Sequence, residues 1–321
     1  MELSAPVRIA VRAVVAVVAA TLVVSCSDRD SSPSIVVGAG NSVQSELIAQ
    51  IYAGALARTG VHTAVKTGLG QRGDLLAALD ADTVTVIGDD SGDLLTALDS
   101  GSPARIPDKP AADALAADKS DEPPTVAAAL SSALPEGLAI SDLADSTDLR
   151  PSFVLAHEAH QVAALRDLAP RCGELTVGIA TGSELDPLRR SPDPQRDVLD
   201  PLRTVYGCDI TRYTVYPGDA DLRKALQDGQ VQAGVFTAPA ALLPGGDGDL
   251  ATVADSAYAF RAHSIVPLFR KGTLTDTQIK KLNYVAGELT TADFTDMVRD
   301  VRDNHTPAPD LARTWLDNHS L

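Results

Sequence analysis

The sequence predicts an α/β protein made of two lobes, and three observations support this prediction. Strand-like apolar runs alternate with helix-like segments in two blocks, residues 34–87 and 149–243, as in sheets covered by helices. The chain has 321 residues, which is long enough for two domains. Its 45% hydrophobic and 22% charged residues are ordinary for a globular protein. We therefore expect two α/β lobes of roughly 100 residues each, followed by a helical C-terminal part.

The first block contains strand and helix signals in strict alternation. Because strand, helix, strand, helix, strand is the order of βαβ units, we expect a parallel sheet covered on both faces. The expected strands are 34–38, 61–66 and 83–87, and the expected helices are 43–58 and 75–79. Residues 100–124 are rich in Ala, Asp and Pro, which indicates a surface excursion.

The second block repeats this alternation and is followed by one more strand and three helical segments. The expected strands are 153–156, 175–179, 210–215, 231–236 and 265–269, and one connecting helix is expected at 221–226. Ligands of such folds bind at the carboxyl ends of parallel strands. The candidate ligand-binding segments are therefore 38–44, 88–92, 180–184 and 237–238.

The charge of the chain limits the class of partner. It has 27 basic and 43 acidic residues, a formal net charge of −16. Nucleic-acid binding needs a basic face, and adhesion of a protein surface to anionic lipid needs one as well. We therefore expect no nucleic-acid partner.

The first 25 residues are typical of a lipoprotein signal peptide. Two arginines precede an apolar run at 13–24, which is shorter than the roughly 20 residues of a membrane span. The run ends in Val23-Val24-Ser25-Cys26, which resembles a bacterial lipobox. We expect lipid on Cys26, a tether at 26–33 and a location on the extracytoplasmic face of the membrane. A plain secretory signal and a retained N-terminal anchor are the alternatives.

Two further cysteines, Cys172 and Cys208, fit an exported protein, because disulfides persist in oxidising compartments. A bridge between them would close a loop of about 37 residues and contribute roughly 4 kcal/mol. Two free buried cysteines are the alternative.

Several segments together resemble the osmoprotectant-binding proteins of ABC importers, the glycine betaine, choline and carnitine type. The segments are 35–60, Gly70-Gln71-Arg72-Gly73 through Asp89-Asp90-Ser91-Gly92, 226–237, and Ile265-Val266-Pro267 through Trp315-Leu316. The resemblance implies a type II periplasmic-binding-protein clamshell with hinge strands near Ala139–Ser152 and Arg261–Phe269. Lobe I would comprise 34–138 and 268–321, and lobe II would comprise 139–267.

The resemblance also implies what the protein does. A monomer would bind a small solute and dock on membrane permease subunits, without catalysis, cofactor or metal. The family holds a trimethylammonium group among aromatic faces. Here Asp90 stands where one ring is usual, and Phe236-Thr237-Ala238-Pro239 lacks the usual final Asp. The solute is therefore a quaternary ammonium compound or another small polar or aromatic molecule.

We expect the ligand-binding residues to come from strand ends in both lobes. Polar groups would fix the solute, Phe236 would offer a ring face, and the aspartates would favour a cation. The expected set is Asn41, Ser42, Asp89, Asp90 and Ser91 from one lobe, and Thr181, Phe236 and Thr237 from the other.

Other functions remain as alternatives. The first is an envelope sensor or scaffold with the same fold. The second is a dinucleotide enzyme, because Gly68-Leu69-Gly70-Gln71-Arg72-Gly73 matches the phosphate-binding fingerprint and Asp89 follows at the distance of a ribose-binding acid. His157-Glu158-Ala159-His160 and Asp89-Asp90-Ser91-Gly92-Asp93 lack the spacing of zinc and calcium motifs, so neither predicts a metal.

Overall fold

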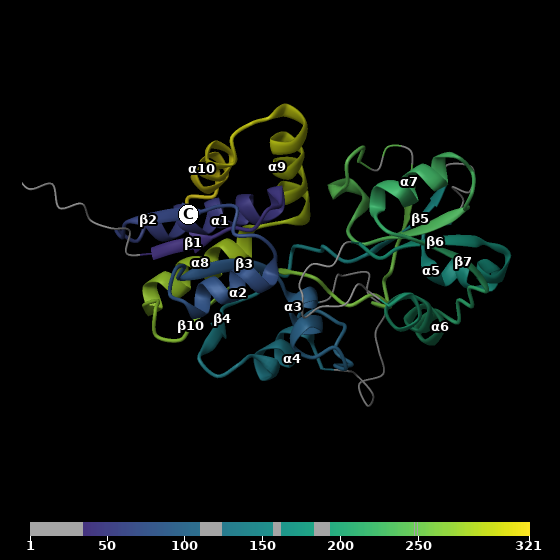
Figure 1. Ribbon diagram of the computed structural model, residues 1–321, viewed down its shortest axis with the longest axis horizontal. Helices are drawn as coiled ribbons and strands as arrows, with labels where there is room; N and C mark the ends of the chain where they lie inside the picture. The colour runs from purple at the N-terminus through teal and green to yellow at the C-terminus, as the bar shows by residue number, and fades with distance from the viewer. Residues whose placement is uncertain (1–34, 110–123, 157–161, 183–192, 247, 249) are drawn as a thin grey trace, which may run out of the picture. The chain divides into compact units, whose positions relative to one another are not determined.

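Two five-stranded sheets, each with helices packed against it, organise the chain in this computed structural model (Figure 1). The structure describes residues 35–109, 124–156, 162–182, 193–246, 248 and 250–321. The first sheet has the strand order β2-β1-β3-β10-β4, and the second has the order β7-β6-β8-β5-β9. The α/β, two-lobed fold class expected from the sequence is confirmed.

The first sheet combines the start of the chain with a strand from its last quarter. Strands β1 (Ile35–Gly38), β2 (Thr63–Lys66) and β3 (Val86–Asp90) are parallel. Strand β10 (Ile265–Arg270) runs antiparallel between β3 and β4 (Leu138–Ile140).

Alternation of side chains along the strands divides the apolar residues of this sheet between two cores. Ile35 and Val37 belong to one core, and Val36 packs against the other. The first core is shared with α1 (Val43–Ala57), α8 (Asp276–Glu288), α9 (Thr291–Asn304) and α10 (Ala308–Asn318). The second is shared with α2 (Arg72–Asp80), α3 (Ser91–Leu98) and α4 (Val126–Ala133). Figure 1 shows the C-terminal helices, in yellow, beside the purple N-terminal elements.

The second sheet has the same two-core plan. Phe153 and Leu155 of β5 face one core, and Val154 faces the other. The strands are β5 (Ser152–Ala156), β6 (Thr176–Ala180), β7 (Arg212–Tyr216), β8 (Ala233–Phe236) and β9 (Leu250–Val253). The helices are α5 (Leu165–Leu168), α6 (Asp200–Tyr206) and α7 (Asp219–Gln227), with short turns η2 (Ala169–Glu174), η3 (Pro194–Leu199) and η4 (Ala240–Leu242).

The parallel arrangement expected for the strands of the first block is confirmed for β1, β2 and β3, and each sheet also contains antiparallel pairs that the sequence did not predict. In the first sheet β10 is antiparallel to both neighbours, and in the second β5 is antiparallel to β8 and β9. The expected strand 83–87 also begins later, at Val86, because Thr83 and Val84 donate their amides to Ala78 and still close the end of α2.

Two segments cross between the sheets, residues 141–151 and 254–264. They overlap the hinge strands that the resemblance implies. The implied lobe boundaries after residues 138 and 267 fall inside β4 and β10, all of whose residues belong to the first sheet. The division of the chain into lobes at those positions stays a prediction.

The expected disulfide is present. Cys172 and Cys208 are bonded, with 5.3 Å between their Cα atoms, and both are buried. The signal peptide, Cys26 and the tether lie outside the described residues. Within the described part of the chain, no helix has the length and apolar character that a bilayer span requires.

Candidate functional site

The segment after β1 supplies the first two expected ligand-binding residues, and both are exposed. The Asn41 amide donates to the carbonyl of Gly70 at 3.1 Å, which joins this turn to the turn before α2. The hydroxyl of Ser42 caps α1 by accepting from the amide of Ser45 at 3.1 Å. The exposed Asn41 side chain is therefore the freer polar group of the two.

At the end of β3, Asp89 forms a bidentate ion pair with Arg72. Arg72 Nη2 lies 2.6 Å from Asp89 Oδ1, and Arg72 Nε lies 2.8 Å from Asp89 Oδ2. The two side chains are only 9% and 6% exposed. Burial opposes the charge on Arg72, but Asp89, helped by Asp93 and Asp90, outweighs it and raises the pKa of the guanidinium.

Arg72 was not among the expected site residues. The sequence did contain a feature that could have identified Arg72. It lies in the strand-to-helix turn Gly70-Gln71-Arg72-Gly73, and Asn41 was selected because it lies in a turn of the same type. The Nη1 atom of Arg72 is buried and has no hydrogen-bond partner.

Asp90 lies between the first turn of α3 and the second crossing segment. Its Oδ1 accepts from the amide of Asp93 at 2.9 Å and lies 3.2 Å from His263 Nδ1. The His263 ring packs directly on Gly92, where an added Cβ would overlap with the ring. Asp90, Asp93 and His263 each bring one potential metal-ligand atom within 4.8 Å of the others, a cluster that the sequence did not predict.

Ser91 binds the same crossing segment through two hydrogen bonds. Its amide donates to the carbonyl of Ser264, and its hydroxyl accepts from the amide of Ser264, both at 2.9 Å. Ser91 is 1% exposed. Its hydroxyl therefore holds the crossing segment against α3 instead of standing free for a solute.

The second sheet holds the other three expected residues, each engaged within that sheet and its helices. Thr237 donates its amide and its hydroxyl to Asp219, at 2.9 and 2.6 Å. Thr181 donates to the carbonyl of Tyr216. Phe236 is 0% exposed and packs in the core with α7, so its expected role as an exposed ring face is wrong in this structure.

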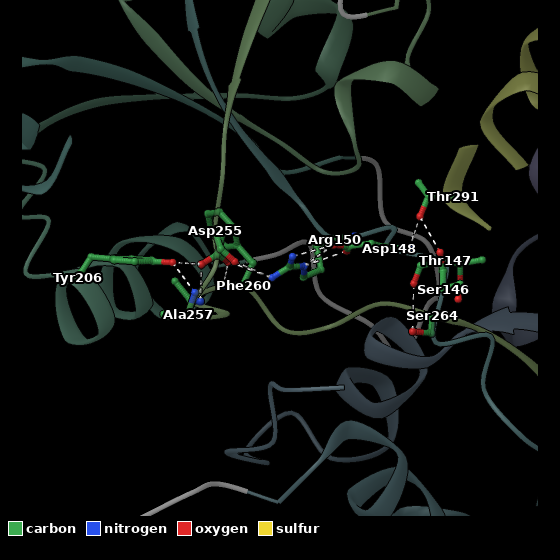
Figure 2. A network of polar contacts seen from close by, with 11 residues as sticks. Ser146, Thr147, Asp148, Arg150, Tyr206, Asp255, Ala257, Phe260, Ser264 and Thr291 are labelled. Carbon is green, nitrogen blue, oxygen red and sulfur yellow. Dashed lines mark hydrogen bonds and ion pairs between the residues drawn. The ribbon is translucent and has the colours of Figure 1, made fainter. Parts of the chain in front are cut away.

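A polar network joins the two crossing segments (Figure 2). Arg150 of the first segment binds Asp148 at 2.7 Å and Asp255 of the second at 3.4 Å. Asp255 also accepts from the hydroxyl of Tyr206 in α6 at 2.7 Å. Burial and then the charge of Asp255 raise the pKa of Tyr206. The first segment is held in turn to α9, because Thr291 exchanges hydrogen bonds with Ser146 and Asp148.

Replacing Asp255 by asparagine should lower the free energy of unfolding by about 1–3 kcal/mol, the effect of leaving a buried polar group unpaired. Oδ1 accepts from the amide of Ala259 and Oδ2 from the amide of Phe260. Whichever way the new amide group lies, its nitrogen therefore faces a backbone N–H donor. Urea denaturation would measure the change.

Asp148→Asn is the matched control, because it removes the other carboxylate that binds Arg150. The Asp148 side chain is 50% exposed. An ion pair of this exposure contributes about 0–1 kcal/mol, so this variant should be the more stable of the two. Equal stability of both variants would contradict a structural role for Asp255.

The geometry does not favour the dinucleotide alternative. Asp89 is the candidate ribose-binding acid, but both of its carboxylate oxygens accept hydrogen bonds from Arg72, a residue of the Gly-rich turn itself. The helix after that turn, α2, has only 9 residues. His157 and His160 lie outside the described residues.

Comparison with known proteins gives both a family and a fold. The model of a family described as the substrate binding domain of ABC-type glycine betaine transport systems matches residues 33–318. A solved glycine betaine/carnitine/choline ABC transporter protein is similar in structure, with a TM-score of 0.64, 16% identity, and coverage of 89% of this chain and 98% of that one. The apo form of YehZ from Escherichia coli is similar as well, with a TM-score of 0.63, 16% identity and the same coverage. No curated protein matches the sequence.

Proposed function

Because this chain belongs to the family of substrate-binding domains of ABC-type glycine betaine transport systems, we propose that its own solute is a small ammonium compound recognised mainly by the carboxylate of Asp90. As a member of that family it is an extracytoplasmic substrate-binding protein that binds a small solute and interacts with permease subunits, and it is not an enzyme. The finer question is which ammonium group the site prefers.

The observation that carries the proposal is a carboxylate, and not an aromatic ring, at the end of β3, together with the burial of the ring that ends β8. Asp90 occupies the position at which the family resemblance leads us to expect a ring, and Phe236 is fully buried. A ring face attracts a methylated ammonium through its quadrupole, whereas a carboxylate makes short charge-assisted bonds to N–H donors. We therefore propose that an ammonium group with N–H donors binds more tightly than a trimethylated one.

A series that differs only in N-methylation tests this proposal. Glycine betaine, dimethylglycine, sarcosine and glycine share one carboxylate and one cationic nitrogen. Isothermal titration of the purified protein should show affinity increasing as methyl groups are removed. Tightest binding of glycine betaine would contradict recognition by carboxylates, and no binding of any of the four would exclude this solute class.

Asp90→Asn should weaken binding of the preferred solute by about tenfold or more, because a hydrogen bond to a charged group contributes about 1.5–3 kcal/mol. Asparagine caps a helix about as well as aspartate, so the start of α3 should survive the change. Asp167→Asn, on an exposed part of α5, removes one negative charge elsewhere and should leave the affinity unchanged. Unchanged affinity in Asp90→Asn would remove Asp90 from the site.

We also propose that the protein is a monomer held on the membrane by lipid on Cys26. The apolar run and the lipobox-like Val23-Val24-Ser25-Cys26 support the anchor. The mass of the mature N-terminal peptide would test it. The alternative of a sensor without transport finds no support in the family match.

A further inference from the structure

A cavity of about 990 Å³ lies beside β4, bounded by α4, α8 and both crossing segments. None of the eight expected ligand-binding residues lines it. We propose that this cavity is a second binding site, which takes an extended organic cation with N–H donors, such as a diamine. This inference is independent of the solute proposed above.

The charged groups of the cavity are mostly negative. Four carboxylates line it, from Asp108, Asp142, Asp145 and Asp148, of which Asp148 is already paired with Arg150. The lysine among the lining residues, Lys109, lies 3.8 Å from Asp145 and its side chain is 84% exposed. An ion pair so exposed is screened by solvent and binds weakly. The cavity therefore attracts cations.

Two buried polar atoms at the cavity have no hydrogen-bond partner. They could accept hydrogen bonds from a ligand, in addition to the attraction that the carboxylates exert on a cation. They are Asp145 Oδ1 and Ser141 Oγ. Leaving such atoms unpaired costs about 1–3 kcal/mol each, so a ligand that donates to them gains affinity. A primary ammonium group carries three N–H donors and a full positive charge, which suits both atoms.

The spacing of the carboxylates favours an elongated cation over a single metal ion. Among the described residues, the group of potential ligands close enough to share one ion is Asp90, Asp93 and His263, of which only His263 lines the cavity. That cluster contains Asp90 and so belongs to the solute site proposed at the end of β3, with Arg72 3.7 Å from Asp93. The cavity carboxylates do not converge in this way.

Protonation of Asp145 gives the site a pH dependence. Burial raises the pKa of Asp145, the charge of Lys109 opposes this shift, and the nearby carboxylates of Asp108 and Asp142 add to it. As the pH falls, Asp145 therefore gains a proton sooner than an ordinary aspartate does. The affinity for a cation should decrease in the same interval, and binding there should release protons.

The test uses 1,4-diaminobutane as the probe and isothermal titration of the purified protein. We expect saturable one-to-one binding that Asp145→Asn weakens about tenfold or more, and that Ser141→Ala also weakens. Asp145→Asn should fold normally, since folding raises the pKa of Asp145 and the ionised form is therefore the disfavoured one. Asp167→Asn is the charge-matched control on α5 and should bind as the unaltered protein does.

Three results would overturn the proposal. The first is the absence of saturable binding. The second is equal binding by the unaltered protein and by Asp145→Asn. The third is loss of diamine binding in Asp90→Asn with retention in Asp145→Asn, which would place the diamine in the solute site at the end of β3. The glycine betaine series reports on that solute site separately, so failure of one proposal is distinguishable from failure of the other.

Discussion

Replacing Arg72 by alanine should lower the free energy of unfolding by about 3–5 kcal/mol, because the change leaves Asp89 as a buried charge with no cation beside it. Asp89 would keep the hydrogen bond from the amide of Asp90, at 2.7 Å. One neutral donor does not replace a guanidinium that binds both carboxylate oxygens. Urea denaturation of the single variant would measure the loss.

The double variant Arg72→Met/Asp89→Leu distinguishes two effects on stability. One is the cost of leaving Asp89 unpaired, and the other is the net contribution of the ion pair compared with apolar side chains. Apolar side chains of similar volume often replace a buried ion pair with little loss of stability. We therefore expect this variant to recover most of the stability that Arg72→Ala loses, while losing solute binding. A double variant as unstable as Arg72→Ala would show that packing, and not charge, sets the effect.

Local sequence patterns were enough to predict most of the secondary structure. The apolar runs before Gly38 and Thr237 are the strands β1 and β8, and the expected helix at 43–58 is α1. Periodicity along one segment cannot reveal which distant strand pairs with it. That is why the antiparallel insertion of β10 between β3 and β4 was missed.

The candidate site was predicted only in part, for a related reason. The structure places Asp89 and Asp90 at the end of β3 and Ser91 at the start of α3, as the strand-end rule expects, and their role in binding stays a prediction. Their partners Arg72 and His263 come from other turns and crossing segments, and only tertiary packing brings them together. The same packing buries Phe236, whose position at a strand end gave no information on its exposure.

Removing the disulfide should lower the free energy of unfolding by roughly 4 kcal/mol, since the bridge restricts a loop of about 37 residues in the unfolded chain. Cys172→Ala/Cys208→Ala is the variant to use, because serine would bury two hydroxyls. Of the strands in the second sheet, β7 should lose the most stability when the disulfide is removed. Arg212 to Val215 are all exposed, so little apolar burial holds this edge strand in place.

Hydrogen exchange would localise the effect. Cys172 lies shortly before β6 and Cys208 shortly before β7, so the bridge fixes the start of the parallel pair that these two strands form. Without it, the amides that pair β7 with β6 should exchange faster, whereas those pairing β1 with β2 in the other sheet should change little below the unfolding transition.

The reduced unaltered protein is the matched comparison and should behave as the double variant does. If its denaturation midpoint were the same with and without reductant, the bridge would contribute nothing to stability, and the weakly buried edge strand would be held by its backbone hydrogen bonds alone.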